Sequence, residues 1–273
     1  AVLRRVRPDV LVGLGGYISF PGALVGLLCN KPLLLHEANS VAGSANRLLA
    51  RLADRVFTAF PDVLANGECV GNPLRPAFLQ QPSPEARFAG RSGPLRLLVV
   101  GGSLGARALN VTVPQALALL PVDRRPSVTH QSGEKQIEEL RANYARAGVQ
   151  AELTPFISDT ASAYAQADLL LCRAGASTVT ELAAVGAAAL LVPFPAAVDN
   201  HQTGNARFLV ERDAAWLLPQ AQLTPERLAQ FIRDMDRAAL LQRAVAAKAL
   251  AQTQATAAVV AACEELACEE NRA

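Results

Sequence analysis

The sequence has few aromatic side chains, only three histidines and little net charge. Phe, Trp and Tyr make up 5% of the 273 residues, and the formal net charge is +2. Proteins that bind nucleic acid usually present a strongly basic surface, and those that bind single strands also stack bases on aromatic side chains. The composition therefore argues against nucleic acid as a partner. Since 51% of the residues are apolar and 18% are charged, the chain is suited to a soluble globular protein, and its length allows two domains.

The cysteine patterns that would indicate a zinc site or a disulfide framework are also missing. The sequence has five cysteines, an odd number, and no C-x-x-C pair. They are Cys29, Cys69, Cys172, Cys263 and Cys268. Most lie in apolar surroundings, so we expect buried free thiols in a reducing compartment.

Long hydrophobic runs are limited to one uncharged stretch, residues 10–30, which glycines and a proline interrupt. A strand over 10–14, a glycine loop and a short buried helix are therefore expected there, in place of a membrane-spanning helix. Residues 1–56 carry seven Lys or Arg against three Asp or Glu, a net charge of +4, while the rest of the chain carries −2. Such a cationic segment suits a surface near anionic lipid, and it suits ordinary solvated helix faces equally well.

The most informative stretch begins with an apolar strand, residues 169–172. A turn of small residues follows, and then a helix in which Ser177, Thr178 and Thr180 place hydroxyls near the start. Unpaired N–H groups and the helix dipole favour a phosphate there. Glu181, one turn further, can accept hydrogen bonds from the two hydroxyls of a ribose. The stretch predicts a nucleotide site, although hydroxyls at a helix start are also common as ordinary caps.

Two more loops are expected at the same edge of the sheet. A polar loop follows a strand over 188–192, and a glycine loop follows a strand over 95–100. Their candidate residues are Asp199, His201 and Gln202 in the first loop and Gly102, Ser103 and Gly105 in the second. The glycine loop fits a phosphate cradle, but it lacks the Lys of a P-loop and the G-x-G-x-x-G spacing, so a tight turn is the alternative.

The N-terminal part has a similar pattern of loops after strands. Candidate residues follow the strand over 10–14 and a second strand over 33–35. They are Gly15, Gly16, Tyr17, His36, Glu37 and Asn39. Glycine allows close approach of a ligand to the backbone, and open α/β sheets bind ligands at the carboxyl ends of strands. A tight turn and a structural histidine are the alternatives.

Strands alternate with helices along the chain, which predicts an α/β protein with parallel sheets. We expect a partial N-terminal domain over residues 1–75, a linker rich in Pro, Gln and Ser over 76–93, a C-terminal domain over 94–240 and a long C-terminal helix within 241–273. Arg75, at the start of the linker, is suited to pair with a diphosphate, with an ordinary surface arginine as the alternative.

Eight motifs occur in order along the chain: GGY, HEAN, GNPLR, GGSLGA, HQSG, a strand ending PFI, CRAGASTVTE and VDNHQTGNA. In these motifs the sequence resembles the MurG family of GT-B glycosyltransferases. The resemblance implies two Rossmann-like domains facing a cleft, the N-terminal one incomplete. It also implies an inverting hexosyltransferase that moves N-acetylglucosamine from UDP-N-acetylglucosamine (UDP-GlcNAc) to lipid I, giving lipid II. Such an enzyme serves peptidoglycan synthesis, cell shape and cell division, and is a peripheral protein on the cytoplasmic face of the bacterial cell membrane.

The resemblance also assigns donor contacts. They are Asn39, Arg75, Ser103, Ile157, Ala176, Ser177, Thr178, Val179, Thr180, Glu181 and Gln202. Glu181 would hold the ribose, Ile157 the uracil edge and Ser103 the diphosphate. No cofactor and no metal are expected, because two helix starts and Arg75 can stabilise the departing diphosphate.

Three departures from the family pattern are present. Family members begin with a strand and a GGTGGH-like loop whose histidine is a candidate general base, and this sequence does not contain that loop. We therefore expect these residues to bind the donor and to catalyse transfer poorly or not at all. HEAN stands where HEQN is common, and Leu104 where Gln is common. Two alternatives stay open: another GT-B glycolipid transferase, such as a diacylglycerol glycosyltransferase, and a non-catalytic nucleotide-sugar-binding subunit.

Overall fold

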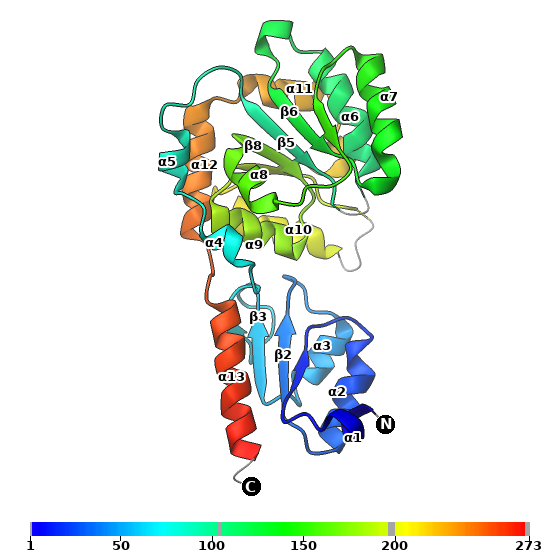
Figure 1. The fold of residues 1–273 in the computed structure, drawn as a ribbon, viewed down its shortest axis with the longest axis vertical. Coiled ribbons are helices and arrows are strands. Elements are labelled where there is room, and N and C mark those ends of the chain that lie inside the picture. The colour runs from blue at the N-terminus through cyan, green and yellow to red at the C-terminus, as the bar shows by residue number, and fades with distance from the viewer. Residues whose placement is uncertain (1, 103–104, 196–199, 271–273) are drawn as a thin grey trace. The chain divides into compact units, whose positions relative to one another are not determined.

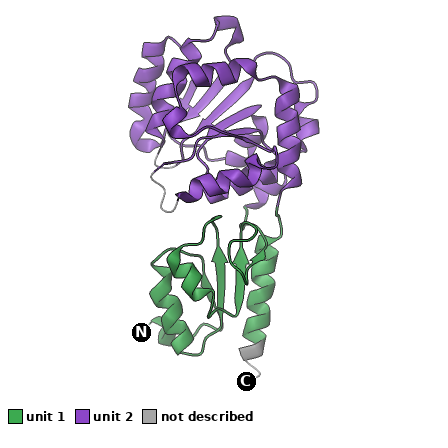
Figure 2. Ribbon diagram, turned by 180° about the vertical axis from the view of Figure 1, so that it is seen from behind, with its two compact units in different colours: residues 1–74, 252–273 green, residues 75–251 purple. Residues whose placement is uncertain are grey.

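The computed structural model describes residues 2–102, 105–195 and 200–270, which form two compact units (Figure 2). They are unit 1, residues 1–74 and 252–273, and unit 2, residues 75–251. Each unit contains one parallel sheet with helices packed on it (Figure 1). The predicted α/β class is therefore confirmed.

Unit 1 is built on four parallel strands that follow one another in sequence order. The strands are β1 (Leu11–Gly13), β2 (Leu33–Glu37), β3 (Arg55–Thr58) and β4 (Glu68–Cys69), and the helices are α1 (Val2–Val6), α2 (Ser19–Leu28), α3 (Ser44–Leu49) and α13 (Ala255–Glu270). Leu33 and Leu35 of β2 pack with Leu49 of α3, whereas Leu34 packs on the other face with Ala262 of α13. Because β2 is buried on both faces, its first three residues form a continuous apolar run, and His36 and Glu37 complete the buried strand.

Unit 2 contains six parallel strands in the order β10-β9-β8-β5-β6-β7. The strands are β5 (Arg96–Val100), β6 (Ser127–Gln131), β7 (Glu152–Thr154), β8 (Leu169–Cys172), β9 (Ala189–Leu191) and β10 (Trp216–Leu217). The helices are α4 (Pro76–Leu79), α5 (Pro84–Phe88), α6 (Arg107–Ala118), α7 (Ile137–Ala147), α8 (Thr160–Gln166), α9 (Ala176–Val185), α10 (His201–Val210), α11 (Pro225–Asp234) and α12 (Arg237–Ala249), with short 3-10 turns η1 (Val122–Arg124), η2 (Glu134–Gln136) and η4 (Gln220–Gln222).

The strand order of unit 2 reverses beside β5. The chain runs outward from β5 to β7 and then returns to β8, on the other side of β5. The loops after β5 and β8 therefore begin next to each other at the carboxyl edge of the sheet. They lead to α6 and α9, which lie on opposite faces (Figure 1). Open α/β sheets bind ligands at such a reversal point.

The C-terminal part of the chain forms two helices, where the sequence predicted one long helix. Helix α12 ends at Ala249 and α13 begins at Ala255, and no Gly or Pro lies between them. Helix propensity alone therefore does not require a break. Helix α12 packs against α5 and α9 of unit 2, while α13 buries Ala262 and Leu266 on the sheet of unit 1. Tertiary packing divides the helix.

Two predictions about burial are wrong. Of the five free cysteines only Cys172 is buried, and Cys29 and Cys268 are exposed. Both exposed thiols lie at or near helix ends, where apolar neighbours in sequence do not ensure burial. The helix expected within residues 10–30 is α2, but only Ala23 and Gly26 of it are buried and half of its residues are exposed. No helix in the described parts of the chain is long and apolar enough to cross a bilayer.

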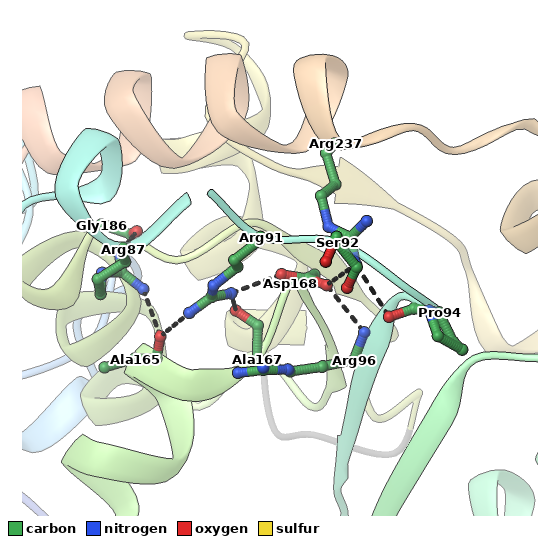
Figure 3. Close-up of polar contacts among 10 residues, drawn as sticks. All are labelled: Arg87, Arg91, Ser92, Pro94, Arg96, Ala165, Ala167, Asp168, Gly186 and Arg237. Atoms are coloured by element: carbon green, nitrogen blue, oxygen red, sulfur yellow. Dashed lines mark hydrogen bonds and ion pairs between the residues drawn. The ribbon is translucent and has the colours of Figure 1, made fainter. Parts of the chain in front are cut away.

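Residues 76–93, where the composition predicted a linker, form α4 and α5 and belong to unit 2. Ser83 caps α5 by accepting the N–H of Ala86. Arg87 then donates to the carbonyls of Ala165 (3.0 Å) and Gly186 (Figure 3). The segment is thus fastened to the ends of α8 and α9.

A buried carboxylate fastens the same segment to the sheet. The side chain of Asp168, at the start of β8, is 0% exposed. Its Oδ1 accepts from Arg91 at 2.5 Å, and its Oδ2 accepts from the Arg96 N–H at 2.9 Å and from Arg237 at 3.2 Å (Figure 3). Two guanidinium groups and one amide therefore compensate a charge that would otherwise be costly to bury.

Candidate functional site

Helix α9 starts at the carboxyl edge of the sheet of unit 2. Its N-cap residue, Gly175, has extended backbone (φ −61°, ψ 149°) and no side chain that could accept a capping hydrogen bond. The first N–H groups of α9 therefore point out of the helix without an acceptor from the side chain of the N-cap residue. The alternative that Ser and Thr simply cap this helix does not hold, and the arrangement suits an anion.

The hydroxyls near the start of α9 have different environments. Ser177 is exposed. The hydroxyl of Thr178 bonds with Tyr164 of α8, and that of Thr180 donates to the carbonyls of Ala176 (3.1 Å) and Ser177 (3.0 Å). Of the three predicted hydroxyls, only that of Ser177 faces solvent at the mouth of the helix.

Glu181 lies one turn inside α9 with its side chain 18% exposed. Burial raises the pKa of its carboxyl to about 7, and the nearby charge of Arg75 opposes that rise. The Glu181 Oε1 and Arg75 Nη2 atoms are 3.9 Å apart. Near neutral pH the site therefore holds a carboxylate that is only partly ionised.

Arg75 is held from two other elements although its side chain is 62% exposed. Its Nη2 donates to the Thr160 hydroxyl, at the start of α8, at 2.6 Å. Its guanidinium also lies 4.9 Å from the centroid of the Phe78 ring of α4, in cation–π geometry. The alternative of an ordinary surface arginine does not account for its contacts with Thr160, Phe78 and Glu181.

The glycine loop follows β5, and α9 follows β8, the strand beside β5. The loop and the start of α9 therefore lie at neighbouring strand ends. A Cβ on Gly105, whose φ is +76°, would lie 2.2 Å from the Ser132 carbonyl oxygen, and one on Gly101 would lie 2.6 Å from the Ala106 amide nitrogen. Only glycine fits at these positions. Gly102 also has positive φ, and its carbonyl accepts from Gln131 at 3.0 Å. Ser103 and Leu104 lie outside the described residues.

Helix α6 begins just after this loop, and its N-cap residue Ala106, like Gly175 of α9, has no polar side chain to cap the helix. Gln131, at the end of β6, donates to the carbonyls of Gly102 and Pro155, and its Oε1 is buried without a partner in the described part of the chain. Two uncapped helix starts therefore lie at the reversal point of the sheet, which is suited to the two phosphates of a diphosphate.

The remaining candidates of unit 2 flank this point. Ile157, between β7 and α8, lines a cavity of about 480 Å³ together with Phe156 and Ser158. At the start of α10, Gln202 accepts the Phe194 N–H at 2.9 Å, and His201 is partly exposed. Asp199 lies outside the described residues.

The candidates of unit 1 lie at the carboxyl edge of its own sheet. His36 and Glu37, at the end of β2, are 2% and 4% exposed. His36 donates to the Gly71 carbonyl at 2.8 Å, and Glu37 accepts from the Asn39 N–H at 2.9 Å and from Asn46 at 2.6 Å. His36 thus makes the structural contact given as its alternative, and Glu37 fixes Asn39.

The glycine pair of unit 1 precedes α2. Gly15 and Gly16 have φ values of +88° and +78°, and the following Tyr17 is 88% exposed. A Cβ on Gly15 would lie 3.1 Å from the side-chain nitrogen of Asn46. The backbone conformation therefore explains both glycines without a ligand.

Comparisons with known proteins agree with this arrangement. The chain matches the glycosyltransferase family 28 N-terminal domain over residues 1–58 and the family 28 C-terminal domain over residues 96–261. MurG of Acinetobacter baumannii, known from a crystal structure, is 41% identical with a TM-score of 0.87, over 97% of this chain and 75% of that one. The UDP-N-acetylglucosamine--N-acetylmuramyl-(pentapeptide) pyrophosphoryl-undecaprenol N-acetylglucosamine transferase of Polaromonas sp. strain JS666 is 67% identical over 97% of this chain and 69% of the relative.

This chain belongs to the MurG family. The enzyme of the same name from Albidiferax ferrireducens is 68% identical, again over 97% of this chain and 69% of the relative. The predicted family and its GT-B fold are therefore confirmed.

Two residues at the site of this MurG-family chain were not predicted. Thr160 was missed because a threonine at a helix start normally indicates a cap, and here Asp159 is the cap. Tyr164 was missed because its position on α8 is typical of a core aromatic. No local sequence signal could have paired Thr160 with Arg75, 85 residues away.

Proposed function

We propose that this protein transfers N-acetylglucosamine from UDP-GlcNAc to lipid I, with inversion at the anomeric carbon, and so forms lipid II in peptidoglycan synthesis. The identity of 67% to a relative named for this transfer carries the proposal. The two uncapped helix starts beside a partly buried carboxylate support it, because a nucleoside diphosphate needs amide donors and an acceptor for its ribose.

The proposed donor contacts follow from this geometry and from the family resemblance. The diphosphate lies against the starts of α6 and α9, with Arg75 as a further donor and with Ser103 assigned by the resemblance alone. Glu181 accepts from the ribose hydroxyls, and the backbone at Ile157 borders the uracil. The resemblance alone assigns Gln202, Asn39 and the stretch from Ala176 to Thr180.

The chemical role of these residues is to stabilise the leaving group. In an inverting displacement the acceptor hydroxyl attacks the anomeric carbon while negative charge develops on the departing UDP. Preorganised N–H groups at helix starts and a guanidinium stabilise this charge without reorganisation. Arg75 is suited to the task because Thr160 and Phe78 already hold its guanidinium.

Two assays test the function. Isothermal titration calorimetry is expected to detect UDP-GlcNAc binding, and GDP-mannose is expected to bind much more weakly. Any transfer of radiolabel from UDP-GlcNAc is expected to be slow, because the sequence does not contain the GGTGGH-like loop with the candidate base, and to go to lipid I, with lipid I but not diacylglycerol competing as acceptor. Preferential labelling of diacylglycerol would assign the chain to another GT-B glycolipid transferase.

Donor binding is expected to survive removal of divalent metal ions. An Asp-x-Asp sequence occurs once, at Asp234 and Asp236. Asp234 accepts from Gln230 at 2.8 Å, and Asp236 caps α12 by accepting the Ala239 N–H at 2.8 Å, so both carboxylates have structural roles. Calorimetry in excess EDTA should therefore give the affinity for UDP-GlcNAc measured without EDTA. A strict requirement for added Mg²⁺ or Mn²⁺ would contradict the proposed site.

We also propose peripheral binding to the cytoplasmic face of the bacterial cell membrane. The support is the charge of +4 on residues 1–56 and the exposure of Tyr17 (88%), Ile18 (78%) and Leu28 (77%) in unit 1. The protein is expected to sediment with vesicles that contain anionic phospholipid and to be released at high salt. Equal sedimentation with neutral vesicles at both salt concentrations would refute the electrostatic contribution to membrane binding.

A further inference from the structure

We propose that Thr160 is a positioning residue for the donor: its hydroxyl holds the Arg75 guanidinium beside the Glu181 carboxylate, so that both act on one nucleotide. This inference rests on the proposed function. It concerns a residue to which neither the sequence motifs nor the family resemblance assigns a role.

Within the described ranges Arg75 makes one close hydrogen bond, and Thr160 supplies its acceptor. The separation of Arg75 Nη2 from Thr160 Oγ1 is 2.6 Å, whereas its separation from Glu181 Oε1 is 3.9 Å. A long, 62% exposed side chain would otherwise sample many rotamers. The hydroxyl therefore selects the rotamer that keeps the guanidinium near the carboxylate.

The elements that hold Arg75 are packed rigidly on one another. Asp159 caps α8 by accepting the Ser162 N–H at 3.0 Å, which fixes the position of Thr160. Four residues later, the buried ring of Tyr164 meets Phe78 edge to face, with the centroids 5.9 Å apart. Phe78 is the residue beneath the Arg75 guanidinium. Both anchors of Arg75 thus belong to one packed cluster.

The ionisation of the Glu181 carboxyl depends on where the Arg75 guanidinium lies. In the described part of the chain, the titratable groups that face this carboxylate are Arg75, Tyr164 of α8 and Cys172 of β8. Burial raises the pKa values of Tyr164 and Cys172, so both stay neutral near pH 7. Arg75 is therefore the cation that favours the ionised carboxylate.

A competing carboxylate lies close by. The charge of Arg75 also lowers the pKa of Asp159, although hydrogen bonds from Ser162 contribute more to that shift. If the Thr160 hydroxyl were absent, the exposed guanidinium could turn toward Asp159 and solvent. The pKa of Glu181 would then rise, and its capacity to accept from a ribose at neutral pH would fall.

The test compares Thr160→Val, which removes the hydroxyl and keeps the shape, with Thr160→Ser, which keeps the hydroxyl. UDP-GlcNAc is the probe because its diphosphate is esterified at both ends and does not titrate near neutral pH. Calorimetry over a pH series should show that Thr160→Val binds about 3- to 10-fold more weakly at pH 7 and that the midpoint of its pH dependence moves upward. Thr160→Ser should restore both values.

Two further measurements keep the inference falsifiable. In Arg75→Gln the Thr160→Val substitution should have no additional effect, because the two residues act in series. An NMR titration of the Glu181 carboxyl without ligand should show a higher pKa in Thr160→Val than in the unchanged chain. An unmoved pKa, or equal losses in the Val and Ser variants that follow their melting temperatures, would overturn the positioning role.

The failure of the proposed function can be distinguished from the failure of this inference. If the unchanged chain did not bind UDP-GlcNAc, the proposed function would fall, and with it any role of Thr160 in donor binding. If the unchanged chain bound the donor and Thr160→Val bound it equally at every pH, only the inference about Thr160 would fall.

Discussion

Glu181→Ala is expected to weaken UDP-GlcNAc binding by about 10- to 100-fold, which corresponds to about 1.5–3 kcal/mol for hydrogen bonds to a charged acceptor. The carboxylate, one turn inside α9, is 18% exposed, and Arg75 is its cationic neighbour. Two ribose hydroxyls can donate to one carboxylate, and alanine offers no acceptor. Calorimetry at fixed pH measures the loss directly.

The pH dependence provides a second signature of the same carboxylate. Because burial raises the pKa of Glu181 to about 7, the free protein becomes protonated there as the pH falls through neutrality. Affinity for UDP-GlcNAc should be greatest above pH 7 and should fall by up to about tenfold per pH unit below it. In Glu181→Gln this dependence should disappear.

Stability separates a binding role from a folding role at this position. A raised folded-state pKa means that the ionised carboxylate destabilises the fold above pH 7, and that this cost is lost as the pH falls through 7. Glu181→Gln should therefore melt at the same or a higher temperature at neutral pH while binding more weakly. Glu138→Ala, at an exposed carboxylate on α7, is the matched control and should leave the affinity unchanged.

Asp168→Ala is expected to lower the free energy of unfolding by about 3–5 kcal/mol. The Asp168 carboxylate is fully buried between Arg91 and Arg237, whose side chains are 10% and 25% exposed. Alanine would leave two largely buried guanidiniums without their counter-charge and the Arg96 N–H without its acceptor. Chemical denaturation of the full chain, followed by the fluorescence of Trp216 in unit 2, measures the change.

Two matched variants show which interactions account for the loss of unfolding free energy in Asp168→Ala. Asp168→Asn keeps an acceptor and removes the charge, so the difference between Asn and Ala separates the ionic contribution from the lost hydrogen bonds. Asp213→Asn breaks another arginine pair, with Arg243 at 2.6 Å, but this carboxylate is 88% exposed. It should change stability by less than about 1 kcal/mol. Equal losses at Asp168 and Asp213 would contradict the role assigned to burial.

The sequence predicts the elements that depend on local pattern. The apolar runs of β5 and β8, each followed by a small-residue turn and a helix, predicted a parallel sheet with sites at its carboxyl edge. Glu181 was predicted from its spacing along one helix. These features depend on periodicity within one or two elements, which a single sequence displays directly.

Other features depend on contacts that no local pattern displays. The bond from Arg75 to Thr160 joins residues 85 positions apart, and the break before Ala255 arises because α12 and α13 pack in different units. The Thr180 hydroxyl was expected at the mouth of the helix, but it bonds to carbonyls of its own helix. A sequence shows that a hydroxyl is present near a helix start, and the structure shows which group it contacts.

The contact between Glu181 and the ribose is tested most directly by a thermodynamic cycle. Calorimetry would compare UDP-GlcNAc with its 2′,3′-dideoxyribose analogue, on the unchanged chain and on Glu181→Ala. We expect the unchanged chain to prefer the natural donor by about 10-fold or more and the variant to bind both ligands equally. If the variant kept the full preference, the carboxylate would not contact the ribose, and the proposed nucleotide site would be wrong.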